Sequence, residues 1–229
     1  MKTNFILAAL LLFVFSGKIF AQDCPQYYPI TMGSSWETQS FDAKDKITGT
    51  TKSKVLTYTT SATGYNMSIE TESSDDKGKN TVKMVYAMKC ENGIFYIDMK
   101  NFLDPTVSEQ YKDMQVSYDV TDMEMPSSLT VGTTLKDASL KMTISNQGMT
   151  LMTITVFTTN RKIESKETIT VPAGTFEAYK LTYDTETKMM FKVKTHTVEY
   201  WVPGKGIIRS EQYNDKDKLQ GYSVMKSMS

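Results

Sequence analysis

Nearly every segment of this chain alternates apolar and polar side chains with a period of two, and this alternation constrains the fold more than any other feature. In the segment SLKMTIS, Leu140, Met142 and Ile144 alternate with Lys141 and Thr143. The segments TVKMVYAMK, TLMTITVF and FEAYKLTYDT follow the same pattern. Because successive side chains of a strand point to opposite faces, such segments rich in Thr, Val, Ile and Tyr indicate half-buried antiparallel strands.

Turn sequences separate these segments at short intervals. FDAKDKIT, SSDDKGKN, CENGIF and YNDKDKLQ are typical of hairpin connections. VPAG and VPGKG place Pro172 and Pro203 where a turn requires a fixed φ angle. The chain therefore predicts an all-β fold of roughly twelve strands, arranged as a single large, strongly curved antiparallel sheet or half-open barrel.

One segment breaks the alternation. In LDPTVSEQYKDM, Asp104 is placed as an N-cap and Pro105 as a first helical residue, which predicts one short helix. The following SYDVTDMEMPSS is expected to be a loop or an edge segment, and it is the best boundary between two halves, 22–125 and 126–229. Without a linker or a clear repeat, we expect both halves to form one β domain over residues 22–229.

The N-terminus has the form of a secretory signal peptide. Lys2 precedes the apolar run FILAALLLFVF, and the small residue Ala21 follows, so residues 1–21 are interpreted as the signal peptide. A membrane anchor is the alternative, but a span needs roughly 20 apolar residues. The sequence FAQDC lacks the small residue that normally precedes a lipidated cysteine. We therefore expect an exported protein, periplasmic or extracellular, with no transmembrane span in the mature chain.

The charge balance gives no sign of a nucleic-acid partner. The chain has 26 basic and 26 acidic residues. Removal of residues 1–21 takes away Lys2 and Lys18, which leaves 24 basic and 26 acidic residues. A nearly neutral chain lacks the basic surface that binds nucleic acid or anionic membranes.

Cys24 and Cys90 are the two cysteines of the chain. In an oxidising compartment such a pair predicts one disulfide, with two free thiols as the alternative. Two cysteines and a single histidine, widely spaced, do not form a zinc site. We expect neither a metal nor a cofactor.

The segments VPAGTFEAYKL and VEYWVPGKGIIRSEQYNDKDKLQGYSVM resemble the C-terminal half of the TapB-like family, and YYPITMGSSWETQSFDAKDKITG resembles its first hairpin. These are secreted or envelope proteins of unknown function, found mostly in Bacteroidota and similar to the 3108 family. The resemblance covers residues from about Cys24 to the end. It implies an extracytoplasmic, curved antiparallel β domain, and it carries no activity and no functional residues. On this reading the aromatic residues Tyr200 and Trp201 serve packing.

Catalytic residues are not expected. His196 lies between threonines and lysines in KVKTHTVEY, a solvent-facing pattern, and no nucleophile elbow of the form G-x-S-x-G is present. Most carboxylates lie in turns beside lysines. Glu199 is the exception, because Val198 and Tyr200 flank it, and a glycosidase pair would have to include a carboxylate of this kind.

Methionine is unusually frequent, with 16 residues. Three interpretations remain open: filling of the core by a flexible side chain, an adaptable cavity for a lipid-like ligand, and copper(I) binding by the Met123–Met125 pair. The cavity interpretation assigns the lining to six residues: Met84, Met88, Met142, Met152, Tyr179 and Tyr183.

These features lead to two functional hypotheses. The first is a non-enzymatic binding or carrier module for an apolar or lipid-like envelope ligand, held by a large curved sheet. The second is a structural or protein-interaction component of the cell envelope, which presents loops and an edge to a protein partner. An envelope hydrolase that uses Glu199 or His196 is kept as a third, formal alternative.

Overall fold

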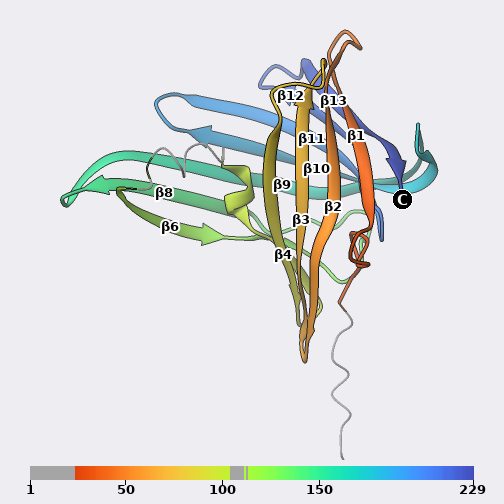
Figure 1. Ribbon diagram of the computed structural model, residues 1–229, viewed down its shortest axis with the longest axis horizontal. Helices are drawn as coiled ribbons and strands as arrows, with labels where there is room; N and C mark the ends of the chain where they lie inside the picture. The colour runs from red at the N-terminus through yellow and green to blue at the C-terminus, as the bar shows by residue number, and fades with distance from the viewer. Residues whose placement is uncertain (1–23, 104–110, 112) are drawn as a thin grey trace, which may run out of the picture.

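The computed structural model describes residues 24–103, 111 and 113–229. Within these residues the chain forms thirteen strands and one short 3-10 turn, Met99–Phe102, which confirms the all-β fold (Figure 1). The strands are β1 Ser35–Asp42, β2 Ile47–Ser61, β3 Gly64–Asp75, β4 Val82–Glu91, β5 Ile94–Ile97, β6 Gln115–Thr121, β7 Met123–Met125, β8 Ala138–Asn146, β9 Met149–Val171, β10 Gly174–Lys188, β11 Lys192–Val202, β12 Gly206–Asn214 and β13 Leu219–Met228. The expected signal peptide and most of the expected helix after Asp104 lie outside the described residues.

All thirteen strands belong to one sheet, in the order β6-β8-β9-β10-β11-β12-β13-β1-β2-β3-β4-β5-β7. The first and last strands pair directly, with Trp36 opposite Met228 and Asp42 opposite Gly221. This pairing brings both halves of the chain into the same sheet. In Figure 1, β1, β2 and β3 lie side by side, while β6 and β8 run nearly across them.

The two ends of the sheet are neighbours in the sequence. β6 and β7 are its outermost strands, and only Asp122 separates them. Because one residue spans at most about 3.6 Å, the sheet must curl until its two edges meet at this point. The predicted strong curvature is therefore confirmed. The segment predicted as a loop or edge contains most of β6 and all of β7, the two edge strands.

Three hairpin turns repeat the same chemistry. Asp42 Oδ1 accepts the backbone N–H groups of Lys44 and Lys46, at 2.8 and 3.0 Å. Asp75 and Asn214 accept the equivalent pairs in the β3–β4 and β12–β13 turns. These side chains replace water as partners of the turn backbone, which is why Asp and Asn favour such positions. The predicted hairpins are confirmed.

The buried side chains form two apolar clusters. The first includes Tyr27, Trp36, Val55, Ile69, Phe95, Ile163, Leu181, Trp201 and Met225. The second comprises Met99, Leu103, Met123, Ala138, Leu140, Met142, Ile144, Ile154 and Val156. The 23-residue strand β9 contributes to both clusters, so the two apolar clusters are connected through this strand.

Candidate functional site

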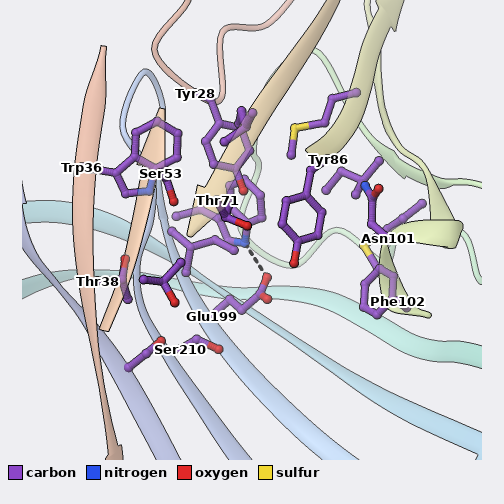
Figure 2. Close-up of a pocket in the computed structure, with 18 of the residues that line it drawn as sticks. Tyr28, Trp36, Thr38, Ser53, Thr71, Tyr86, Asn101, Phe102, Glu199 and Ser210 are labelled. Atoms are coloured by element: carbon purple, nitrogen blue, oxygen red, sulfur yellow. Dashed lines mark hydrogen bonds between the residues drawn. The ribbon is translucent and has the colours of Figure 1, made fainter. Parts of the chain in front are cut away.

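The curved sheet encloses a cavity of about 440 Å³ (Figure 2). Its wall combines apolar surface with hydroxyl groups and one carboxyl group. Aromatic rings come from Tyr28, Trp36, Tyr86, Phe102, Tyr183 and Trp201, and the other apolar side chains are Ile69, Met88, Ile97, Met123 and Ile207. The polar side chains are Thr38, Ser40, Thr51, Ser53, Thr71, Ser210, Ser223, Asn101 and Glu199. We call this cavity the main pocket.

Residues 24–31 cross the sheet as an N-terminal strap that bears no strand of its own. The predicted disulfide is confirmed, since Cys24 and Cys90 are joined. Backbone hydrogen bonds from Gly204 N to Gln26 O and from Gly206 N to Tyr27 O, at 2.6 and 2.8 Å, hold the strap against the β11–β12 turn. The strap is therefore fixed both covalently and by hydrogen bonds.

Tyr28 brings the strap into the wall of the main pocket. Its ring stacks on Trp36, with centroids 5.9 Å apart, and meets Trp201 edge-on at 5.6 Å. Burial raises the pKa of the Tyr28 phenol far above its usual value. Gly206 makes the contact possible, because a Cβ atom there would lie 2.5 Å from the Tyr28 ring. Tyr28 and Trp36 lie in the upper part of Figure 2, with Ser53 and Thr71 beside them.

Glu199 supplies the carboxyl group of the pocket, opposite the stacked rings in Figure 2. The Tyr183 hydroxyl donates to its Oε1 at 2.8 Å, and the Trp201 indole N–H donates to its Oε2 at 2.8 Å. Burial raises the pKa of Glu199, while these two donors and the nearby positive charge of Arg161 act in the opposite direction. One donor from the neighbouring strand β10 and one from β11 itself thus fix the carboxyl group.

Arg161 of β9 is completely buried. Its Nη1 donates to Lys136 O at 2.7 Å and its Nη2 to Glu124 O at 3.0 Å, while Nε has no hydrogen-bond partner among the described residues. Burial lowers the pKa of Arg161 to about 10. Because backbone carbonyls carry no full charge, carboxylates such as Glu199 offset the buried cation over a longer range.

The six residues predicted to line a cavity are divided between several environments. Met88 and Tyr183 line the main pocket. Tyr179 packs against the first cluster, Met142 is fully buried in the second, and Met152 packs against the second. Met84 lies outside both clusters and accepts a hydrogen bond from the Tyr86 hydroxyl at 3.4 Å.

Sequence reasoning missed most of the pocket wall. Trp201 was assigned to packing, and it is indeed 2% exposed, but one side of it also faces the pocket. Serine and threonine on an alternating strand resemble a solvent-facing surface, so nothing marked them as pocket residues. The sequence did distinguish Glu199 from the other carboxylates, because two apolar residues flank it.

The other candidates for chemistry are His196, which lies outside the main pocket, and the pair Met123 and Met125, of which Met123 lines it. His196 Nδ1 lies 2.7 Å from Asp184 Oδ1, and Asp184 also accepts from Asn160 Nδ2 at 2.8 Å. Met123 and Met125 belong to different clusters, and Met125 Sδ accepts a hydrogen bond from Arg161. The described part of the chain contains no group of three or more His, Cys, Asp or Glu side chains placed to hold a metal ion.

Comparison with known proteins finds the same fold in two crystal structures. A crystal structure of a proposed lipoprotein from Parabacteroides distasonis is 25% identical, with a TM-score of 0.72 over 91% of this chain and 100% of that chain. A proposed exported protein of YmcC-like fold from Bacteroides fragilis is 23% identical, with a TM-score of 0.70 over 90% of this chain and 100% of that chain.

The chain belongs to the DUF3108-like family, whose model matches residues 31–225. The resemblance stated from the sequence is thereby confirmed. No curated protein is similar enough to count as a match. Among the described residues, no helix is both long enough and apolar enough to cross a membrane.

Proposed function

We propose that this protein is an exported, non-enzymatic binding or carrier module, whose apolar or amphiphilic ligand occupies the main pocket. The observation that carries the proposal is a pocket of about 440 Å³ whose wall combines aromatic and aliphatic side chains with hydroxyl groups and one carboxyl group, Glu199, held by two hydrogen bonds. Ligand sites in proteins have this size and this combination of surfaces.

The chemistry of the wall supports binding rather than catalysis. Among the twenty residues that line the main pocket, Glu199 is the only carboxyl group, and there is no histidine, lysine, arginine or cysteine. In the wall Glu199 therefore lacks the histidine, lysine, cysteine or second carboxylate that commonly acts with a carboxylate in acid–base or nucleophilic catalysis, and the side chains that hydrogen-bond to it are Tyr183 and Trp201. His196 and Asp184 line a separate cavity.

The location is supported by two observations. The Cys24–Cys90 disulfide is typical of oxidising compartments outside the cytoplasm. The two similar crystal structures are described as a proposed exported protein and a proposed lipoprotein. Because the Cys24 sulfur is already bonded to Cys90, it is not available for a lipid thioether.

Tryptophan fluorescence offers a direct test, because both tryptophans of the chain, Trp36 and Trp201, line the main pocket. We expect the neutral apolar probe N-phenyl-1-naphthylamine to bind saturably and to accept energy from them. Thr38→Phe should abolish this signal by filling the pocket. Gln39→Phe is the matched control, because Gln39 is the next residue of β1 and points to the other face.

The proposal fails if the probe shows no saturable binding and native mass spectrometry of gently extracted protein finds only the free chain. It also fails if Thr38→Phe and Gln39→Phe, both folded, bind the probe as tightly as the wild type does.

One feature favours the second hypothesis, a structural or protein-interaction role in the envelope. Two hairpin tips expose large apolar side chains, with Met190 87%, Phe191 75% and Met149 69% exposed. Exposed apolar groups of this size often mark contact sites. A Met190→Ser/Phe191→Ser variant should then lose a reproducible crosslinked partner in the native host, while it keeps probe binding.

A further inference from the structure

Four polar side chains form one continuous row across four neighbouring strands. Glu199 of β11 pairs with Ser210 of β12, Ser210 pairs with Ser223 of β13, and Ser223 pairs with Ser40 of β1. All four line the main pocket. Because neighbouring strands lie about 4.8 Å apart, this polar row is about 14 Å long.

The three serine hydroxyls of the polar row are free to bind a ligand. Among the residues that the structure describes, none of them has a hydrogen-bond partner. The same three serines also line a neighbouring cavity of about 260 Å³, together with Thr48, Gln212, Gly221 and the stacked rings of Phe41 and Tyr222. The polar row therefore lies where the two cavities meet.

Glu199 also has unused hydrogen-bonding capacity. A carboxylate offers about four acceptor positions, and the Tyr183 hydroxyl and the Trp201 N–H each take one. Both donors approach from the protein, so the remaining positions are left for a donor in the pocket. Glu199 lies at one end of the polar row, which places a strong acceptor beside three hydroxyls that can donate or accept.

The wall disfavours an anion. Its only formally charged group is a carboxyl, and none of the lining residues is a lysine, arginine or histidine that could pair with a fatty-acid carboxylate or a phosphate. A single ammonium group would satisfy Glu199 but would leave most of the 14 Å row without a partner. A head group with several hydroxyls matches the length and the donor–acceptor character of the whole row.

We infer that the ligand is an uncharged amphiphile whose head group carries several hydroxyls, as a sugar or another polyol does. Its hydroxyls bind Glu199 and the serines of the polar row, and its apolar part lies against the Trp36, Tyr28 and Trp201 rings. This inference rests on the proposed binding function and adds the chemical class of the ligand.

Three probes with the same eight-carbon chain test the head group: octyl β-glucoside, octanoate and octylammonium. Each is titrated into the oxidised protein below its critical micelle concentration, and tryptophan fluorescence reports the pocket. We expect octyl glucoside to bind at least about tenfold more tightly than octanoate, because a hydrogen bond to a charged group is among the strong ones. It should also bind more tightly than octylammonium.

Two variants test the residues. Glu199→Gln should weaken octyl glucoside binding by about tenfold and should leave octanoate binding unchanged or tighter. The Ser210→Ala/Ser223→Ala double variant should weaken octyl glucoside binding without affecting octanoate. Ser61→Ala is the matched control, since Ser61 is exposed at the end of β2. Unchanged N-phenyl-1-naphthylamine binding by each variant shows that the pocket is intact.

The outcomes separate the two proposals. Tightest binding of octanoate or octylammonium overturns the inference but leaves the binding function standing. Octyl glucoside binding that neither variant weakens also overturns it, and so does binding of the naphthylamine probe alone. If no probe binds at all, the proposed function itself fails.

Discussion

The Cys24–Cys90 disulfide should account for a large part of the stability of this protein. The bond joins residues 66 positions apart. In the chain-entropy model, closing a loop of that length restricts the unfolded chain by about 4 kcal/mol at 25 °C. Protein domains are stable by only about 5–15 kcal/mol, so the Cys24→Ser/Cys90→Ser variant should lose roughly a quarter or more of the wild-type free energy of unfolding.

The measurement is urea unfolding of the wild type and the double variant, followed by tryptophan fluorescence. The wild type under a strong reductant is the control, and it should lose a similar free energy of unfolding. We also expect weaker binding of the naphthylamine probe after reduction of the disulfide, because the strap carries Tyr28 into the pocket wall. A loss below about 1 kcal/mol, with both proteins two-state, would refute the loop-closure reasoning.

Three further predictions concern the pocket and the buried charges. Gly206→Ala should cost about 1–3 kcal/mol in urea unfolding, because Gly206 has a φ of +83° and its Cβ would overlap the Tyr28 ring. Arg161→Met should cost about 3 kcal/mol, because two partly buried carbonyls lose their donors. Burial raises the pKa of Glu199 above 4.5 in the folded state, so wild-type stability should fall as pH rises from 4.5 through that pKa, and Glu199→Gln should flatten this part of the curve.

Each of these predictions has a result that contradicts it. A neutral Gly206→Ala change would mean that Tyr28 moves aside at no cost. An Arg161→Met variant as stable as the wild type would mean that water replaces Arg161 as the donor to the Lys136 and Glu124 carbonyls. An identical pH dependence of unfolding in wild type and Glu199→Gln would mean that this carboxyl has the same proton affinity in the folded and unfolded chain.

Local patterns were sufficient to predict the strands, the hairpins and the disulfide. Alternation fixes which residues share a face, and Asp42, Asp75 and Asn214 stabilise turns through contacts within a few residues. The pairing of β1 with β13 was not predictable in this way. This pairing joins residues almost two hundred positions apart, and the sequence of neither strand indicates with which strand it pairs.

The pocket was harder to predict for the same reason. Met88 and Met142 lie on equivalent apolar faces of alternating strands, yet Met88 faces the pocket and Met142 is packed in a solid cluster. The curvature of the whole sheet decides which face encloses space. Ser40, Ser210 and Ser223 come from three strands, and only the register of those strands assembles them into one row.

The short link between β6 and β7 limits how far the two edges of the sheet can move apart. Asp122 is the only residue between the two edges, and its carboxylate accepts the backbone N–H of Met99 at 3.2 Å. At this point the covalent chain itself keeps the two edge strands of the sheet, β6 and β7, close together. The next residue, Met123, lines the main pocket. On the proposed binding function, a ligand of different size would therefore be accommodated by the strap and the side chains rather than by separation of the two sheet edges at this point.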